Sequence, residues 1–530
     1  MRRVVVLGGG TGGTLVANRL RRLLDRDAAQ ITVIDADDEH VYQPGLLFVP
    51  FGRARPAGLV RSRRRQFRAG VTFRQAVVDR VDLDRDEVLL ADGTPVGYDV
   101  LVVASGARLL PEETEGLTGP GWMEKVFTFY TRDGAAGLHR ALAGFNGGRL
   151  AVAVMDLPVK CPVAPLEFCF LADSYFRGRG IRDKVELTYV TPLDGAFTKP
   201  VCNRELGGLL RDKGVTLVTE FNTGQVDGAG GRLVSYDGRE VPFDLAVVVP
   251  LHGGQAYVDR SPGLGDELGF VPVDQGTLQS KARPNVFAIG DAADVPTSKA
   301  GSVAHFEGEV VARNVTRYLA GGPAGRELRR AHQLLHRKRG GEGPADRLQL
   351  RNRAADRALP RPGGPAAAAP VTAQPPREAG VRLAVLARAA ARPGDPRRPQ
   401  PDARRRQALP GATGAMKRNE RGRNAMPTVT YAGTAVAVND EGFFTDPGQW
   451  REEMAPLIAG QEGLAELTER HWQVIKFMRH EYEAKGSGPT VRVLGKTSGV
   501  TVKELYQLFP QGPAKTAAKI AGIPKPRGCV

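Results

Sequence analysis

The stretch RRVVVLGGGTGGTLVANRL, residues 2–20, decides the fold of the first part of the chain. Its run of branched apolar residues predicts a buried strand, and the residues after the glycines predict the start of a helix. Between the two, Gly8, Gly10 and Gly13 have the Gly-x-Gly-x-x-Gly spacing. Glycines at this spacing permit a tight turn, a close approach of backbone to a pyrophosphate, and close packing of helix on strand. The stretch therefore predicts a Rossmann-like dinucleotide-binding domain.

The residues that follow supply two further parts of such a site. The helix begins at the glycine turn, so the backbone at its start, Thr11 included, faces the phosphates, where the helix dipole favours negative charge. A second strand, AQITVIDADD, reaches Asp35, which is placed to hold a ribose hydroxyl. A plain tight turn is the alternative, and the strand, helix and acidic residue in register argue against it.

Two later stretches favour FAD as the dinucleotide. YDVLVVASGARLLP reads as a strand that ends in a small-residue turn at Gly106, and PNVFAIGDAADVPTSKAG as a strand that ends in Gly290 and Asp291. Both resemble the later signatures of the two-dinucleotide-domain flavoprotein family, whose Gly-Asp pair places an aspartate on the flavin ribityl chain. The resemblance implies that these three residues bind FAD. The alternative for Asp291 is an ordinary strand-end cap.

That family normally carries a second glycine fingerprint, for NAD(P)H, between those two signatures. Here the corresponding strand is GRLAVAVM, and the residues after it, DLPVKCPVAPLEFCFLADSYF, include no glycine. KVELTYVTP supplies the next strand, so the fold of the second domain is expected to be kept while its nicotinamide site is lost. The flavin must then be reduced by something else, and a cysteine occupies the vacated turn.

The chain has four cysteines, which are too few and too scattered for a disulfide scaffold or a zinc site, so no metal is expected. Cys161 lies in the connection between a predicted strand and the helix that follows it. The helix dipole is expected to lower the pKa of its thiol and favour a redox role. A buried structural cysteine is the alternative. Cys169 lies on the apolar helix that follows and is expected in the core. Cys202 either approaches the flavin or has no role.

Residues 1 to about 320 resemble the sulfide:quinone oxidoreductase family through VYQPGLLFVPFG, KCPVAPLE, TYVTPLDGAFTKP and PTSKAGSVAHFE. The resemblance implies that hydrosulfide or polysulfide is oxidised at a cysteine pair beside the flavin, through a persulfide, and that the reduced FAD passes its electrons to a membrane quinone. Cys161 matches one family cysteine. His252 and Lys299 are candidate flavin or quinone neighbours, with a loop histidine and a surface lysine as the alternatives. A type II NADH dehydrogenase or a flavocytochrome-type sulfide dehydrogenase flavoprotein is the alternative enzyme.

The formal net charge of +16 is confined to one segment. Residues 323–425 hold 24 of the 74 Lys and Arg residues but 8 of the 58 Asp and Glu residues, and no aromatic residue. Such a composition predicts a disordered basic linker. A second interpretation is a change of reading frame: read one base later with GC-rich codons, the stretch from Ala331 can encode the Asn-Cys-Phe and KALLIDFNY motifs that the family carries after residue 320. On either interpretation the charge indicates no nucleic-acid partner.

From Met426 the chain resembles the DsrC/TusE sulfur-relay family, through the stretches DEGFF, LFPQGPAK and KIAGIPKPRGCV. The resemblance implies a mainly helical domain whose penultimate Cys529, on an extended proline-containing arm, carries a persulfide sulfur between persulfide-donating and sulfur-accepting proteins. Many members have a second arm cysteine eleven residues earlier. Here that position is Ala518, so simple sulfur carriage is expected. Lys525 and Arg527 are expected to favour the Cys529 thiolate.

The sequence thus predicts an α/β two-dinucleotide-domain flavoprotein followed by a small helical domain. An FAD-binding domain is expected at 1–110 and 270–320, a second Rossmann-like domain at 111–269, the basic segment at 321–425 and the carrier at 426–530. Met1 leads straight into a strand and no apolar run has the length of a membrane span, so a cytoplasmic protein is expected. Peripheral association with the cytoplasmic membrane is expected only for a frame-restored protein. A chain in which only the sulfur carrier functions is the non-enzymatic alternative.

Overall fold

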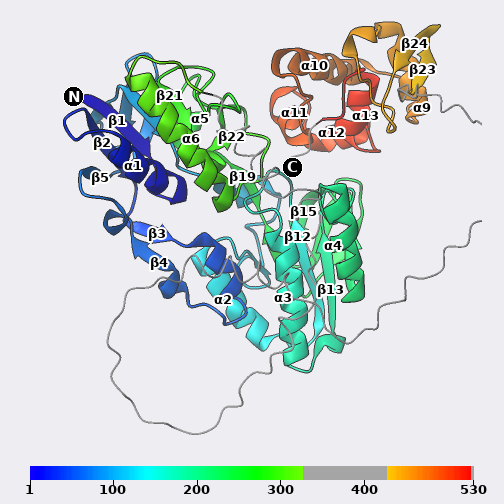
Figure 1. Ribbon diagram of the computed structural model, residues 1–530. Helices are drawn as coiled ribbons and strands as arrows, with labels where there is room; N and C mark the ends of the chain where they lie inside the picture. The colour runs from blue at the N-terminus through cyan, green and yellow to red at the C-terminus, as the bar shows by residue number, and fades with distance from the viewer. Residues whose placement is uncertain (326–426, 527–530) are drawn as a thin grey trace, which may run out of the picture. The chain divides into compact units, whose positions relative to one another are not determined.

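The computed structural model describes residues 1–325 and 427–526, and the two parts are treated in turn (Figure 1). The greater part of the basic segment, with the proposed change of reading frame, lies outside the described residues, as do Arg527 and Cys529.

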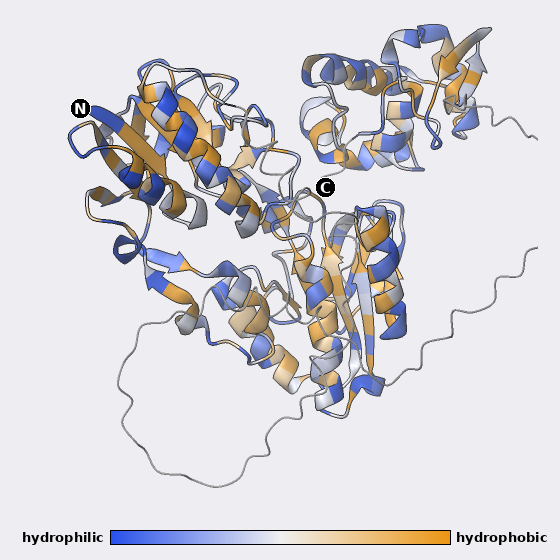
Figure 2. Cartoon of the chain, in the orientation of Figure 1, coloured by the Kyte–Doolittle hydropathy of each residue, from blue (hydrophilic) through white to orange (hydrophobic). Residues whose placement is uncertain are grey.

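The first part is organised around a five-stranded parallel sheet in the order β21-β9-β1-β2-β5. The strands are β1 (Arg2–Leu7), β2 (Ala29–Asp35), β5 (Val71–Gln75), β9 (Val100–Val103) and β21 (Val286–Ala288). Every residue of β9 and β21 is buried. A parallel sheet covered on both faces needs such continuous apolar strands, which Figure 2 shows in the hydrophobic colour.

Two helices, α1 (Thr11–Leu23) and α6 (Gly301–Leu319), pack against each other beside this sheet (Figure 1). A side chain links them, because Arg19 of α1 donates a hydrogen bond to the carbonyl of His305 in α6 at 2.7 Å. Helix α1 begins four positions after the end of β1, and the Gly290 N–H, two positions after β21, donates to Glu307 of α6, so the first turns of both helices lie near the carboxyl ends of these strands. In open α/β sheets this edge is the usual place for a ligand.

The glycine turn after β1 has the tight geometry that the sequence predicts. Gly8 has a φ of +97°, and a Cβ built on it would lie 2.6 Å from the carbonyl oxygen of Ala104. A Cβ at Gly13 would lie 1.8 Å from the carbonyl oxygen of Gly8. Because both neighbours are backbone atoms, neither can move aside for a side chain. These two glycines bring α1 directly onto the end of β1.

A second parallel sheet follows, in the order β11-β18-β12-β13-β14. Its strands are β11 (Val126–Phe127), β12 (Gly148–Val154), β13 (Val185–Val190), β14 (Val215–Val218) and β18 (Leu245–Val249). Helix α3 (Ala164–Gly178) connects β12 to β13, and α4 (Pro200–Asp212) connects β13 to β14. The sheet has the alternation of strand and helix of a Rossmann-like domain, as expected.

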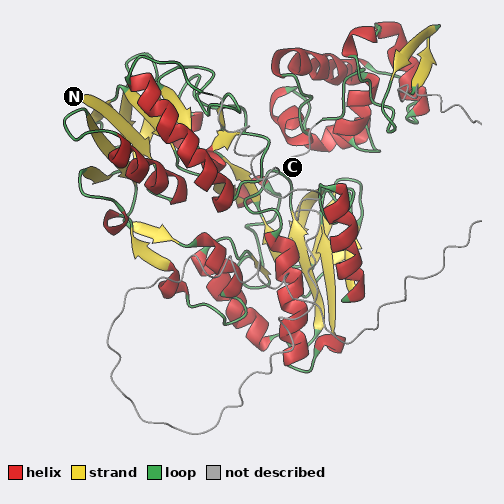
Figure 3. Ribbon diagram, in the orientation of Figure 1, coloured by secondary structure: helices red, strands yellow, loops and turns green. Residues whose placement is uncertain are grey.

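The second part, residues 427–526, is mainly helical, with one hairpin (Figure 3). The hairpin pairs β23 (Thr428–Tyr431) with β24 (Thr434–Ala437). The helices are α9 (Ala455–Gln461), α10 (Glu469–Lys485), α11 (Val491–Thr497), α12 (Val502–Leu508) and α13 (Pro513–Ile520). Thr468, Thr490 and Thr501 cap α10, α11 and α12 by accepting backbone N–H bonds. The buried residues that form the core of this part lie between Tyr431 and Ile523.

Within residues 1–325 and 427–526, no helix combines the length and the apolarity needed to cross a bilayer.

Candidate active site

The predicted ribose-binding residue, Asp35, stands at the end of β2 and faces the glycine turn. Its carboxylate accepts hydrogen bonds from the backbone N–H groups of Gly9, at 2.7 Å, and Ala36, at 2.8 Å. The guanidinium of Arg63 lies 3.0 Å from the same carboxylate, with both side chains mostly buried. Arg63 was not foreseen from the sequence, because it lies 28 positions further along the chain, next to the hairpin strand β4 (Val60–Ser62).

The start of α1 has the form expected for phosphate binding. Thr11 is the first residue of the helix and Gly10 is its N-cap, so the unpaired N–H groups of the first turn point out of the sheet edge. Among residues 1–325 and 427–526, no atom other than those of its chain neighbours lies within 4 Å of a Cβ built at Gly10, so packing of these residues does not explain a glycine there. Gly106 follows β9, whose carboxyl end lies beside that of β1.

The Gly290–Asp291 pair forms a turn directly after β21. Gly290 has a φ of +68°, and its N–H donates to the carboxyl of Glu307 at 2.7 Å. Burial raises the pKa of Asp291, and the cations Lys299 and Lys160 act in the opposite direction. The turn is therefore fixed from α6, and it presents a buried acid at the same sheet edge as the glycine turn.

Lys299 is part of this turn and is not a surface lysine. Its ammonium donates to the carbonyls of Asp291, at 2.9 Å, and Ala293, at 3.2 Å. It also lies 3.8 Å from the centre of the Phe270 ring. These contacts hold the segment before α6 in place.

Cys161 is joined directly to that segment. It lies in the loop between β12 and α3, which contains no glycine, and its backbone N–H donates to the carbonyl of Lys299 at 2.8 Å. Lys160 and Lys299 form an isolated parallel bridge. The structure thus brings Cys161, from the second sheet's domain, next to the Gly290–Asp291 turn of the first.

The expectation that the α3 dipole lowers the thiol pKa of Cys161 is wrong. Burial raises this pKa to about 11, and the carboxyl of Glu167 acts in the same direction. Cys161 precedes α3 by three residues, whereas Glu167 lies in the first turn and opposes the dipole. Near neutral pH the thiol is therefore protonated, and Cys161 needs the loss of a proton before it reacts.

Three further side chains surround this loop. The hydroxyl of Tyr130 donates to the carbonyl of Lys160 at 2.9 Å and lies 3.4 Å from that of Cys161. The ammonium of Lys160 donates to Gln43 at 3.2 Å, and burial lowers its pKa. Tyr130 and Gln43 were missed because each meets Lys160 only through the fold.

His252, a candidate flavin or quinone neighbour with a loop histidine as the alternative, lies in the short strand β19 (Leu251–Gly253). Its ring packs edge-on against Tyr130 with the ring centres 5.6 Å apart. Burial, reinforced by the charge of Lys160, lowers its pKa to about 3, so the imidazole is neutral. His252 therefore packs beside the Cys161 loop, through Tyr130, with an uncharged imidazole.

The two other described cysteines differ in burial. Cys169 is fully buried on α3, which confirms its prediction as a core residue, and burial raises its pKa. Cys202 is half-buried in the first turn of α4, against the same apolar core as Cys161.

The C-terminal arm leaves its domain from a fixed base. The indole N–H of Trp450 donates to the carbonyl of Ile520 at 2.8 Å, and Arg479 donates to that of Ala521 at 2.7 Å. Ile523 is 1% exposed, so the arm begins at the next residue, Pro524. Ala518 is buried in α13 and is part of the domain core.

Lys525 does not stand free to favour a thiolate, as the sequence suggested. Its ammonium lies 2.6 Å from the carboxylate of Glu441. An ion pair of this kind offsets the charge that Lys525 would otherwise offer to Cys529.

A single methyl group added at Gly522, at the base of the arm, is expected to destabilise the C-terminal domain strongly. Gly522 has a φ of +61°, and a Cβ there would lie 2.1 Å from the Trp450 ring. Because the Arg479 guanidinium covers that ring at 4.2 Å, we expect Gly522→Ala to lower the free energy of unfolding by about 3 kcal/mol. Urea unfolding of residues 426–530, followed by tryptophan fluorescence, measures the change.

Gly442 offers the matched control. It has a φ of +85°, but no atom lies within 4 Å of a Cβ built there. Gly442→Ala is therefore expected to cost only about 1 kcal/mol, the backbone share. Equal losses in the two variants would contradict the role of the Trp450 contact.

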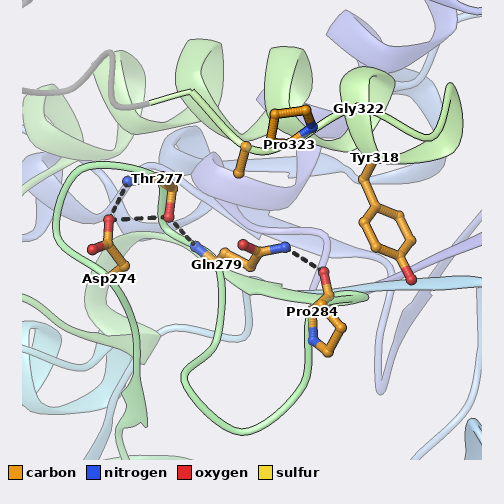
Figure 4. Close-up of a pocket in the computed structure, with 8 residues that line it drawn as sticks. Asp274, Thr277, Gln279, Pro284, Tyr318, Gly322 and Pro323 are labelled. Carbon is orange, nitrogen blue, oxygen red and sulfur yellow. Dashed lines mark hydrogen bonds between the residues drawn. The ribbon is translucent and has the colours of Figure 1, made fainter.

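One cavity of the described residues lies apart from these groups. It has a volume of about 450 Å³ and is lined by Asp274, Thr277, Gln279 and Pro284 together with residues at the end of α6, Tyr318 among them (Figure 4). Asp274 and Thr277 bond to each other within their own turn. The cavity is at the opposite end of α6 from the Gly290–Asp291 turn. Nowhere in the described ranges do three His, Cys, Asp or Glu residues gather as a metal site would require.

The residues at the sheet edge fit a flavin dinucleotide. Gly8 and Gly13 form the tight cradle at the start of α1, and the Gly290–Asp291 turn lies at the same edge. Glu307 supplies a buried carboxyl oxygen, Oε1, with no hydrogen-bond partner in the described parts. The N–H groups at the start of α1 suit a phosphate, which accepts hydrogen bonds. The carboxyl groups of Asp291 and Glu307 suit the hydroxyl groups of a polyol.

Comparison with known proteins agrees with this architecture. The model of the family described as pyridine nucleotide-disulphide oxidoreductase matches residues 2–308. The chain belongs to the pyridine nucleotide-disulphide oxidoreductase family. Membership implies a flavin cofactor and an FAD-dependent oxidoreductase. The loop after β12, where Cys161 stands, lies within the matched range and contains no glycine. The model described as DsrC like protein matches residues 430–530.

Individual relatives match either the first part of the chain or the C-terminal part, as the two family models do. The mitochondrial sulfide:quinone oxidoreductase of Mus musculus is 29% identical over 318 residues, which cover 59% of this chain and 70% of that protein. The sulfurtransferase TusE of Pectobacterium atrosepticum is 42% identical over 107 residues, 19% of this chain and 97% of that protein. The C-terminal domain is thus a DsrC/TusE-like protein in its full length.

Among solved structures, the sulfide:quinone oxidoreductase of Aquifex aeolicus superposes with a TM-score of 0.54 at 19% identity. The match covers 61% of this chain and 78% of that one. At this identity the similarity establishes the fold of the first part and no more.

Proposed function

We propose that the first part of the chain oxidises sulfide at Cys161, with a bound FAD as electron acceptor and a quinone as the final acceptor. The observation that carries the proposal is the bond from the Cys161 N–H to the Lys299 carbonyl at 2.8 Å. It fixes a thiol beside the turn that is proposed to hold the flavin, in the loop where a nicotinamide site needs glycine. The names of the relatives point to the same reaction.

The reaction balances without a further reagent. Hydrosulfide and the Cys161 thiol lose two protons and two electrons, and a sulfur–sulfur bond forms to give a Cys161 persulfide. A flavin held at the sheet edge would supply the two-electron acceptor, with quinone as the final oxidant. Cys161 contributes one of the two sulfur atoms, and its thiol must first be deprotonated because burial raises its pKa to about 11.

Burial and Glu167 disfavour an anionic sulfur at Cys161, and Lys160 is the neighbouring cation that offsets them. Lys160 is adjacent to Cys161, and its ammonium is held by Gln43. A persulfide is more acidic than a thiol, so a nearby cation stabilises the product more than the starting group. Tyr130 holds the carbonyls of both residues and so keeps the loop in one conformation. His252, neutral at physiological pH, adds no competing positive charge.

The electron donor tests this assignment directly. The full-length chain is loaded with FAD under anaerobic conditions and mixed with equal concentrations of sulfide or NADH, while flavin absorbance is recorded. Sulfide is expected to bleach the flavin at least about tenfold faster, because the loop after β12 lacks the glycines of a dinucleotide site. Faster bleaching by NADH would favour a type II NADH dehydrogenase instead.

We propose further that the C-terminal domain carries sulfane sulfur on Cys529. The fixed arm base at Trp450 and Arg479 supports this role, since it leaves only the last few residues to enter a partner. The expected partners are proteins that donate a persulfide sulfur and proteins that accept one. A cytoplasmic location fits both halves of the proposal, and peripheral contact with the membrane is expected only for a frame-restored protein.

A further inference from the structure

Glu307 is a buried carboxyl that none of the steps above uses. It lies on α6 and is 0% exposed. Its Oε2 accepts a hydrogen bond from the Gly290 N–H at 2.7 Å, whereas its Oε1 is buried without a partner among residues 1–325 and 427–526. An unpaired buried carboxyl oxygen is unfavourable, so this position points to a bond with a group outside the described chain.

The charged groups that act on Glu307 come from two segments. Asp291 lies on the turn that Glu307 holds, and Lys299 lies in the segment before α6. Burial raises the pKa of Glu307 to about 7; Asp291 acts in the same direction, while Lys299 and the Gly290 N–H oppose it. At neutral pH the residue is therefore divided between its acid and carboxylate forms.

The anionic end of a dinucleotide lies near this group if the site is used as proposed. In the sheet order, β9 alone separates β21 from β1, so the two strand ends are about 10 Å apart at the usual strand spacing. A pyrophosphate at the start of α1 would place negative charge at that distance, in surroundings of low polarity. Such charge favours the acid form of a carboxyl.

We infer that Glu307 is a positioning residue for the flavin dinucleotide: protonated, it holds the Gly290–Asp291 turn through one oxygen and donates a hydrogen bond to the dinucleotide through the other. In this form Oε2 is the carbonyl oxygen that accepts from Gly290, and the Oε1 hydroxyl is the donor. A carboxylate at the same place would have no proton to donate and would be repelled by the phosphates. The inference rests on the proposed flavin site.

Its consequence is a link between FAD affinity and pH. Below about pH 7 Glu307 is already protonated in the free protein, so FAD binds with full affinity. Above that pH the free protein has lost the proton and must regain it on binding, so the affinity falls. For a single group with a pKa of about 7, the Kd for FAD is expected to be about tenfold larger at pH 8 than at pH 6.

The test uses the full-length chain freed of flavin. FAD is titrated at pH 6, 7 and 8, and quenching of flavin fluorescence gives Kd, while calorimetry at pH 8 in two buffers of different ionisation enthalpy gives the protons taken up. We expect a tenfold change in Kd and the uptake of close to one proton per FAD at pH 8. Glu307→Gln keeps a carbonyl for Gly290 and an N–H donor, and it is expected to show neither effect.

Glu309 provides the control on the same helix. Its exposed carboxylate pairs with Arg313, and Glu309→Gln is expected to keep the pH dependence of the original chain. A Kd that does not change between pH 6 and 8, or a Glu307→Gln variant that retains the tenfold change, overturns the inference. A chain that binds no FAD at any of these pH values overturns the flavin site itself, so the two failures are distinguishable.

Discussion

Replacing Cys161 by serine is expected to slow the reduction of flavin by sulfide by at least about a thousandfold, while FAD still binds. The thiol provides one of the two sulfur atoms of the proposed persulfide, and a serine hydroxyl cannot form that bond. The backbone N–H of Cys161, bonded to the Lys299 carbonyl, holds the loop and is unchanged in the variant. Stopped-flow absorbance of the FAD-loaded, full-length chain measures the rate.

Cys202→Ser is the matched control, because Cys202 is also half-buried and packs against the same core. It is expected to leave the rate within about twofold. If Cys202→Ser and not Cys161→Ser stopped the reaction, the reactive thiol would be the one on α4. In the original chain, alkylation of Cys161 by iodoacetamide should accelerate about a hundredfold between pH 7 and pH 9, since its pKa is raised to about 11.

The second large effect is expected at Cys529. Residues 426–530, incubated with a low-molecular-weight persulfide, should gain one sulfur atom, about 32 Da, through attack of the Cys529 thiolate on the sulfane sulfur. Cys529→Ser should gain none, because this segment contains no other cysteine. Intact-protein mass spectrometry, before and after reduction, separates the persulfide from irreversible additions.

Glu441→Gln is a useful companion variant. It removes the partner of Lys525 and frees an ammonium four residues before Cys529. The loading rate is expected to rise by about twofold at low ionic strength and to return to the original value at high salt. Equal loading of the original segment and Cys529→Ser would leave the sulfur carrier without its thiol.

The first sheet and its glycine turn could be predicted because they depend on local features. Gly8 and Gly13 are required by backbone atoms a few residues away or on the adjoining strand, and an apolar run followed by such a turn has few alternatives. The assignment of Cys169 to the core succeeded for a similar reason. Its neighbours on α3 repeat with helical spacing, so the buried face follows from the sequence.

The electrostatic environment of Cys161 could not be predicted in the same way. Position before a helix suggested a lowered pKa, but the outcome depends on burial by residues distant in sequence, and on a carboxyl, Glu167, in the first turn of α3. Lys525 was misjudged similarly, since its partner Glu441 lies 84 positions earlier in the chain. In both cases the outcome depends on burial or on a charged partner that only the fold supplies.

The burial of Glu307 could have been predicted from the sequence. The residue falls between Ala304 and Val311 on the face of α6 that also carries Val315, and all four residues are buried. An acid on the apolar face of a predicted helix is rare unless something pairs with it. That signal gives the residue but not its partner, because Gly290 is brought to it by the turn after β21.

The fixed base of the C-terminal arm sets a limit on how deep a partner's sulfur can lie. Cys529 is six positions beyond Ile523, the last buried residue of the described range, and a fully extended chain of that length spans about 20 Å. With Lys525 still held by Glu441, only four residues remain, which reach about 14 Å. The arm can therefore reach a partner's thiol within about 14 Å of the surface while the Lys525–Glu441 ion pair is intact. A deeper thiol can be reached only after this ion pair breaks, and a thiol below about 20 Å cannot be reached.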